Sequence, residues 1–443
     1  MPRTLPEPGL GIPAENRIAL AQHEQGISLY RATGNGLRHD VSADGVVWRA
    51  ESTAVGQTQK LWPLCSGETI EQTDLFCVDP LGRIRPTRSE NHRIIAANAL
   101  PAITNTTAWY EAPPEPHDLV IVKEHLNGPY RALFCARRRV GRHPERRGCI
   151  GTATSRDFRT WSMEPPLFAP NRYTKLFSPH VVMDPGRVIL FYSTQEHGDV
   201  RAIRFALAPA AEGPYEHISP DVLCRDARST LATILLGAQR LVFFSRSMPG
   251  ELHLASVSRP GQLDLHPNGR PYVRFYDKLL RLLNAPLFET DAEVSSAETL
   301  VRLLQKHGSN VRFSATVRSD GARHAGLLIR ANMTGHDNIT LWLDFEGGSL
   351  SLRRGVDGRL LAQCRHELQP GVDYKVVMWA EGGFVDIYLD DSWVLTGPTE
   401  SRRSGGFGFA VRGGRALFKT VRAEPIAGPR HVPVRANEDK GSQ

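Results

Sequence analysis

Two segments of the chain place a hydroxyl and a carboxylate at the same spacing ahead of a tryptophan. The segments read HDVSADGVVW and CIGTATSRDFRTW, and the residues concerned are Ser42, Asp44 and Trp48 in the first and Ser155, Asp157 and Trp161 in the second. A serine close to an acid could belong to a catalytic pair. However, Ser and Asp side chains also cap the backbone of tight turns, and a tryptophan ring packs well against a neighbouring sheet. We therefore favour a structural role for both segments.

Three further groups could carry acid–base or binding chemistry. Arg225 and Asp226 are adjacent in LCRDARST, where they form either a structural ion pair or part of a site. Glu196 lies just past an apolar strand in FYSTQEHGD, and the alternative for it is a charge at a hairpin tip. His180, in LFSPHVV, could transfer a proton near neutral pH if it faces an open site. A buried, hydrogen-bonded histidine is the structural alternative.

The elements that must position these groups are β-strands. Short apolar or alternating runs, separated by Gly, Pro, Asp or Asn, recur in the first part of the chain, among them DLVIV, YRALFCAR, RVILFYS, LATILL and RLVFFSR. A unit ending in Ser-x-Asp and Trp fits residues 18–48 and 118–161, with room for a degraded copy between them. Three-strand groups follow at 180–208 and 229–258. About five sheets at a period of roughly 40–50 residues indicate a five-bladed β-propeller, with two stacked sandwiches as the alternative.

The pattern changes after residues 274–288, whose apolar residues have helical spacing and which we interpret as a connector. Regular hairpins without helices follow, and these predict a concanavalin-like β-sandwich. The sequence is therefore expected to be all-β, with a propeller over residues 1–275, a connector over 276–295, a sandwich over 296–427 and a flexible tail over 428–443.

Composition excludes several classes of protein. The chain has 443 residues, of which 41% are hydrophobic and 23% charged, with a net charge of +7, as expected of a globular protein. The basic run Cys135–Arg147 lies between two apolar strands, so we interpret it as a hairpin tip and expect no nucleic-acid partner. There is no signal peptide and no apolar stretch of about 18 residues, which predicts a cytoplasmic protein without a membrane partner. The six cysteines are scattered, which favours reduced, buried thiols and no metal site.

The Ser-x-Asp segments also carry a resemblance to a known family. IGTATSRDFRTW followed by EPPLFAP resembles the blade ending S-x-D-L-x-x-W of glycoside hydrolase family 32 and its relatives in families 43 and 68, and the copy at Ser42 resembles the S-x-D-G-x-x-W variant. The resemblance covers most of residues 15–425 and implies a five-bladed propeller followed by a sandwich. It also implies a glycosidase with paired carboxylates, which lie about 5–5.5 Å apart in retaining enzymes.

The family's catalytic residues can be placed on this chain in two ways. The family has an Asp nucleophile in the first blade, a transition-state-stabilising Asp in R-D-P on the third and an acid/base Glu in E-C-P on the fourth. In the first alignment Asp118 takes the R-D-P position, with His117 replacing the Arg, and Phe177 takes the position of the acid. The first blade then offers Glu15 and Asn16 but no Asp.

The second alignment is shifted by two blades. Asp118 then becomes the nucleophile and Arg225–Asp226 the R-D pair, with Glu251 and Glu289 as the nearby candidates for the acid. Asp118 is favoured by both alignments. The expected site residues are then the catalytic Asp118, Asp226 and Glu196 and the substrate-binding His117, Arg225, Phe177 and His180.

Three functions are compatible with these patterns. The first is a glycoside-processing enzyme of the β-fructofuranosidase or arabinofuranosidase type that acts in the propeller funnel. The second is a repurposed propeller enzyme with acid–base chemistry on a small metabolite, and the third is a non-catalytic sugar-binding protein. In each case the expected ligand is a saccharide or another small molecule, and no cofactor or metal is expected.

Overall fold

The architecture is taken from a computed structural model of the 443-residue chain. The residues that the structure describes are 18–23, 26–33, 36–53, 62–66, 75–78, 84–90, 93–96, 103, 109–110, 119–123, 128–138, 148–157, 159–170, 176–184, 186–195, 201–217, 222–225, 229–246, 256–332, 334–335, 337–399 and 404–427.

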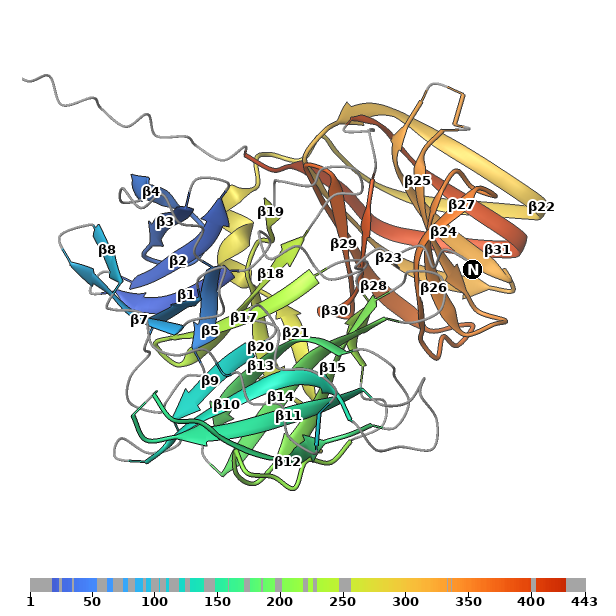
Figure 1. Ribbon diagram of the computed structural model, residues 1–443. Helices are drawn as coiled ribbons and strands as arrows, with labels where there is room; N and C mark the ends of the chain where they lie inside the picture. The colour runs from blue at the N-terminus through green and yellow to red at the C-terminus, as the bar shows by residue number, and fades with distance from the viewer. Residues whose placement is uncertain are drawn as a thin grey trace, which may run out of the picture.

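Antiparallel pairing divides the strands of the first part of the chain into five groups, each called a sheet below, which Figure 1 shows in colours from blue to yellow-green. The first sheet contains β1 (Ile18–His23), β2 (Gly26–Thr33), β3 (Gly36–Ser42) and β4 (Arg49–Thr53). The second contains β5 (Trp62–Ser66), β6 (Leu75–Val78), β7 (Ile84–Glu90) and β8 (Arg93–Ala96). The third contains β9 (Leu119–Lys123), β10 (Tyr130–Arg137), β11 (Gly148–Ser155) and β12 (Ser162–Phe168).

The remaining two sheets follow directly in the chain. The fourth contains β13 (Leu176–Asp184), β14 (Arg187–Gln195), β15 (Arg201–Ala208) and β16 (Val222–Arg225). The fifth contains β17 (Ser229–Leu236), β18 (Gln239–Arg246), β19 (Ser256–Val257), β20 (Gly261–Leu265) and β21 (Pro271–Phe275).

These sheets are arranged as the blades of a propeller. Their first strands, β1, β5, β9, β13 and β17, are neighbours in that order, and β17 in turn neighbours β1. A central strand lies between two adjacent sheets, and where the structure describes its side chains they are buried on both faces. In β13, for example, Val181 belongs to the apolar cluster shared with the third sheet, and Val182 to the cluster shared with the first and fifth. The expected five-bladed propeller is confirmed.

The segment with helical spacing forms a much shorter helix than its pattern predicts. It contains only η4, a 3-10 helix at Asp277–Leu282, in which Leu279 is buried. The chain then pairs with the C-terminal strand, because Asn284 N–H donates to the carbonyl of Pro425 and Leu287 N–H to that of Ala423. Tertiary backbone pairing therefore replaces the helix, and the next strand starts at Phe288, ahead of the sandwich boundary expected at residue 296.

The second part of the chain forms a β-sandwich. Its strands are β22 (Phe288–Gly308), β23 (Val311–Asp320), β24 (His324–Ala331), β25 (Ile339–Asp344), β26 (Ser349–Arg354), β27 (Arg359–Arg365), β28 (Asp373–Glu381), β29 (Phe384–Leu389), β30 (Ser392–Pro398) and β31 (Gly405–Pro425). One sheet runs β22, β31, β24, β25, β26, β27, and the other runs β23, β28, β29, β30. The long β31 also pairs with β23 and so joins the two.

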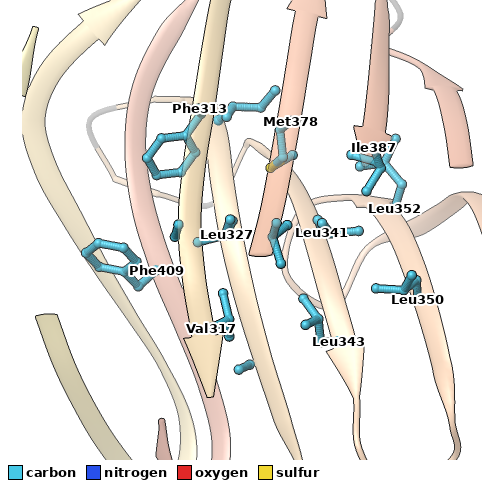
Figure 2. Close-up of a cluster of buried hydrophobic side chains, with 14 of the residues drawn as sticks. Phe313, Val317, Leu327, Leu341, Leu343, Leu350, Leu352, Met378, Ile387 and Phe409 are labelled. Atoms are coloured by element: carbon cyan, nitrogen blue, oxygen red, sulfur yellow. The ribbon is translucent and has the colours of Figure 1, made fainter. Parts of the chain in front are cut away.

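Alternating apolar residues fill the space between the two sandwich sheets. In β23, Phe313 and Val317 point inward together with Met378 and Ile387, and they face Leu341 and its neighbours from the other sheet (Figure 2). Period-two alternation places successive side chains on opposite faces of a strand, which accounts for this core. The expected sandwich is confirmed.

The outer face of the second sandwich sheet packs on the propeller. Trp393 lies against Phe244 of the fifth blade, with ring centroids 4.1 Å apart. Phe275 contacts both Trp379 and Tyr388, at 5.5 and 5.3 Å. Because these rings belong to the same buried cluster as the inner strands of the propeller, the two parts share one continuous apolar core.

Three smaller expectations can also be compared with the structure. Cys135, Cys149 and Cys364 are free and buried, as expected for reduced thiols. The basic run starts within β10, and the pairing of Arg137 with Gly148 confirms a hairpin between β10 and β11. No helix in the described part of the chain has the length and apolar character needed to cross a bilayer.

Candidate functional site

Few of the expected site residues fall within the described part of the chain. His117, Asp118, Glu196 and Asp226 lie outside the described residues, and so do Glu15, Asn16 and Glu251. For Arg225 the structure describes the backbone, which pairs with Ala202 and, in parallel, with Leu395 of the sandwich. Phe177 and His180 are described in full. The strands next to these positions therefore indicate where the candidate site lies.

The central strands of the propeller run in the same direction. β5 and β9 pair in parallel, with Cys65 opposite Val120. His180 of β13 and Thr233 of β17 are hydrogen-bonded to each other at mid-strand. Arg240, which pairs with Leu235 near the end of β17, forms an ion pair with Asp184, the last residue of β13, so these two strands are parallel as well. The N-terminal ends of these strands therefore lie at one end of the propeller.

In the sequence, the expected site residues stand next to strand ends that lie at that same end. Asp118 immediately precedes β9, and Asp226 lies between the end of β16 and the start of β17. Glu196 follows the last residue of β14, which is antiparallel to β13, so the end of β14 lies beside the start of β13. In the sheet register, Phe177 near the start of β13 is opposite Ser193 near the end of β14.

The two Ser-x-Asp turns lie at the opposite end of the propeller. Ser155 ends β11 opposite Tyr130, which begins β10 opposite Lys123, the last residue of β9. In the first blade Ser42 is paired with Ile27 at the start of β2. Neither turn can therefore contribute to a site at the N-terminal ends of the central strands.

Both turns have the capping geometry expected from the sequence. Asp157 accepts hydrogen bonds from the backbone N–H groups of Arg159 and Thr160, at 2.8 and 2.9 Å, and these lower the pKa of its carboxyl. Asp44 accepts from Val46 and Val47 at 2.8 and 3.2 Å in the same way. The structural interpretation of the Ser-x-Asp segments is confirmed.

The two tryptophans differ in what they contact. Trp48 packs edge-on against Phe243 of the fifth blade, with ring centroids 5.7 Å apart, as expected for a ring against a neighbouring sheet. Trp161 belongs to an apolar cluster formed mainly by its own sheet, together with Ile103 and Tyr110. Among the contacts described, the tryptophan of the first copy links two blades.

Phe177, which the sequence aligns with the acid/base position, is buried in the interior. It is 1% exposed, and the register of β13 and β14 shifts between Phe177 and His180. Ser178, within this bulge, has a φ of 49° and is 7% exposed. A non-glycine residue in the left-handed region is uncommon and is held there by its surroundings. This part of β13 offers an apolar ring where the family has a carboxylate.

His180 is a buried, neutral residue between the fourth and fifth blades. It is 2% exposed, and its Nε2 lies 2.8 Å from the hydroxyl oxygen of Thr233. Burial lowers the pKa of His180 to about 3, so the imidazole is uncharged near neutral pH and cannot act there as a general acid. His180 is therefore the buried, hydrogen-bonded histidine that the sequence offered as the structural alternative. Direct contact of Phe177 or His180 with a ligand stays a prediction.

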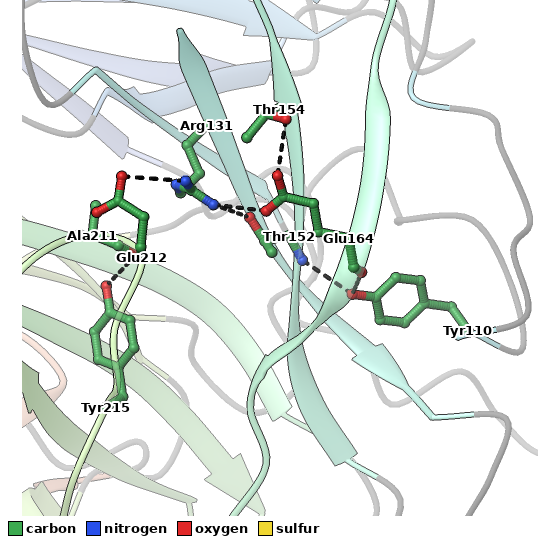
Figure 3. Close-up of polar contacts among 8 residues, drawn as sticks. All are labelled: Tyr110, Arg131, Thr152, Thr154, Glu164, Ala211, Glu212 and Tyr215. Carbon is green, nitrogen blue, oxygen red and sulfur yellow. Dashed lines mark hydrogen bonds and ion pairs between the residues drawn. The ribbon is translucent and has the colours of Figure 1, made fainter. Parts of the chain in front are cut away.

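A polar network that the sequence did not indicate joins the third and fourth blades (Figure 3). Arg131 of β10 forms ion pairs with Glu164 of β12 at 2.8 Å and with Glu212, which follows β15, at 3.3 Å. Thr154 donates to Glu164 at 3.0 Å. Because Arg131 is the second residue of β10, the network lies at the end of the propeller that carries the Ser-x-Asp turns, and we assign it a structural role. The only sequence signal is an arginine inside an otherwise apolar strand.

No group of three or more His, Cys, Asp or Glu side chains in the described ranges could hold a metal ion.

Comparisons with known proteins find the fold but no relative in sequence. No protein-family model and no curated protein matches the chain. An exo-inulinase from Aspergillus awamori is similar in structure, with a TM-score of 0.67, 12% identity and 93% of this chain and 95% of that chain covered. A β-fructofuranosidase of glycoside hydrolase family 32 from Bombyx mori has a TM-score of 0.62 and 12% identity, with 94% of this chain and 95% of that chain covered. A sucrose-6-phosphate hydrolase from Lactobacillus gasseri has a TM-score of 0.60 and 13% identity, with 94% of this chain and 89% of that chain covered.

These structures show that the chain has the fold of family 32 enzymes. At 10–13% identity the likeness concerns the fold alone. The order of the sheets agrees with the first of the two alignments, because β9 is the central strand of the third sheet and β13 that of the fourth. In this order Asp118 adjoins the third blade and Phe177 the fourth.

Proposed function

We propose that the chain is a glycoside-processing enzyme of the β-fructofuranosidase or arabinofuranosidase type, which acts on furanosides in the propeller funnel. The observation that supports the proposal is that the strand ends next to the candidate polar residues in the sequence lie at one end of the propeller. Asp118, Glu196 and Asp226 adjoin strand ends of the third, fourth and fifth blades at that end. The fold shared with fructoside-processing enzymes supports the same substrate class, although fold alone does not fix function.

In this proposal the residues before the central strands have separate roles. Asp118, with His117 beside it, binds sugar hydroxyls and stabilises the positive charge that develops on the sugar in the transition state. Arg225 and Asp226 line the neighbouring blade and bind the substrate. Phe177 and His180, both buried, shape the fourth blade beneath the site.

The general acid has to come from a position other than Phe177. Glu196 follows β14 in the same sheet, three residues beyond Ser193, the cross-strand partner of Phe177. We propose that Glu196 supplies the proton to the leaving oxygen. A positioned general acid contributes about 10²- to 10⁴-fold to the rate, so its loss should be readily measurable.

The test is the release of reducing sugar from sucrose, inulin and an aryl arabinofuranoside. Asp118→Asn and Glu196→Gln should each lower kcat/KM by about 100-fold or more on the substrate that is turned over. Asp157→Asn is the matched control, because Asp157 is exposed and lies at the opposite end of the propeller. Robust turnover by Asp118→Asn would remove this residue from the mechanism.

A second function, binding of a sugar without turnover, is favoured by one observation. In the first alignment Phe177 takes the position of the family's acid, and its ring is 1% exposed. This alternative predicts a calorimetric signal for a furanoside that persists in Asp118→Asn, with no product formed by the native chain.

A repurposed enzyme with acid–base chemistry on a small metabolite is distinguished by its pH–rate profile. Dependence on an imidazole-like pKa would support it over a pair of carboxylates. With a pKa of about 3, His180 cannot supply such a dependence, so it would have to come from His117.

A further inference from the structure

Among the described central strands, backbone pairing occurs between the second and third blades, and the other junctions, including the seam between the first and fifth blades, lack it. β5 and β9 are joined by a parallel backbone pairing. Between the described strands of the first and fifth sheets there is no backbone pairing, although β1 and β17 are neighbours. The contacts that close the ring at this seam must therefore be made by side chains and by the turns.

The first-blade turn, residues 42–48, makes contacts across this seam that its third-blade copy lacks. Gly45, with a φ of 74°, lies so close to the fifth blade that a Cβ there would come within 2.9 Å of Leu241 and 3.1 Å of Phe243. Val46 is fully buried in the cluster formed with the fifth blade. The corresponding residues of the third-blade turn include Arg159 and Thr160, which are exposed. The two turns share their caps but not their surroundings.

The connector holds the same turn through Asp44. Arg281 of η4 forms an ion pair with the Asp44 carboxylate, and the hydroxyl of Tyr276 donates to the Asp44 carbonyl at 3.2 Å. Figure 1 shows η4, in yellow, beside the blue first sheet. Asp157, by contrast, makes its described hydrogen bonds within its own turn.

The sandwich reaches the turn through Arg259 of the fifth blade. Arg259 Nη1 donates to the carbonyl of Val46 at 2.9 Å. Its Nε and Nη2 atoms donate to the two carboxylate oxygens of Glu381, at 2.9 and 2.7 Å. Glu381 ends β28 and also accepts from the indole N–H of Trp379 at 3.4 Å. One guanidinium therefore joins the first blade, the fifth blade and the sandwich, and a bidentate pair of this kind fixes its orientation.

We propose that the turn at residues 42–48 is a clasp through which the sandwich and the connector hold the propeller ring closed. The sandwich then stabilises the closed propeller ring and is not only a neighbouring domain. Glu381 orients Arg259 toward the Val46 carbonyl, and Arg281 holds the Asp44 carboxylate of the same turn. Loss of either cation should open the seam between β1 and β17 before it disturbs the third blade.

Hydrogen exchange of the full chain, followed by mass spectrometry, tests this proposal without any assay of turnover. Glu381→Gln keeps the size of the side chain but removes the ion pair. It should raise exchange in residues 18–42 and 229–246 by roughly 10- to 100-fold, the effect expected when a hydrogen bond to a charged group is lost. Exchange in β9–β11 should change less than about twofold, since global unfolding is not required.

The two aspartates provide a matched pair of variants. Asp44→Asn and Asp157→Asn both keep the oxygen that caps the turn, but only the first removes a charge that faces Arg281. Asp44→Asn should raise exchange at the seam by about 2- to 5-fold, as expected for an exposed ion pair, and Asp157→Asn should leave the seam unchanged. If Glu381→Gln does not fold, Arg281→Gln should reproduce the smaller effect. An equal rise in all blades, or no rise at the seam, would overturn the proposal.

Discussion

The buried His180 predicts how the free energy of unfolding should depend on pH. In the unfolded chain its pKa has the ordinary value of 6.5, whereas burial lowers the pKa to about 3 in the folded chain. Below about pH 6.5 the unfolded state therefore binds a proton that the folded state excludes. This contribution to stability is complete above the unfolded pKa and is lost as the pH falls toward the folded pKa.

The size of the effect follows from the proton linkage of a single group. Each pH unit between the two pKa values costs 1.36 kcal/mol, so lowering the pH from about 7.5 to about 5 should remove about 2 kcal/mol of unfolding free energy. The variant His180→Gln has no such proton to bind. Its starting stability is lower because the hydrogen bond to Thr233 is altered, but its loss between these pH values should be smaller by about 2 kcal/mol.

Urea unfolding at the two pH values, with tryptophan fluorescence and circular dichroism as probes, measures both chains. His324 and His366 also have pKa values lowered by burial, but they are present in both chains and cancel in the comparison. Equal pH dependence of His180→Gln and the native chain would refute the reasoning and show that His180 is accessible to protons in the folded state.

Further predictions concern packing and are tested by the same denaturation assay. Phe177→Ala should destabilise the chain by about 3–5 kcal/mol because the ring is fully buried, whereas a ring lining an open funnel would cost far less. Trp393→Ala should cost about 3–5 kcal/mol and shift the unfolding of propeller and sandwich together, since its ring lies 4.1 Å from that of Phe244; separate transitions would contradict a shared core. Gly151→Ala should cost about 1–3 kcal/mol, because its Cβ would come within 2.3 Å of the Phe134 ring, and a neutral effect would mean that Phe134 can move.

Much of the fold was predictable because its signals are local. The alternation in YRALFCAR and RVILFYS requires only the period of a strand, and the capping of the Ser-x-Asp turns involves residues at most three apart. The repeat of that turn, with the order of strands around it, was sufficient to predict a five-bladed propeller followed by a sandwich. The same pattern also separated the structural Asp44 and Asp157 from the candidate Asp118.

The sequence by itself predicted many of the strands, the capped Ser-x-Asp turns and the order of propeller and sandwich, whereas it left the second sheet only as room for a degraded copy. Only the tertiary structure decided what surrounds these strands and turns, because those contacts join residues far apart in the chain. It reduced the helical pattern near residue 280 to six residues by pairing Leu287 with Ala423. It also buried His180 against Thr233 of the next blade. Finally, it gave two nearly identical turns different neighbours, so that Asp44 faces a cation and Asp157 faces solvent.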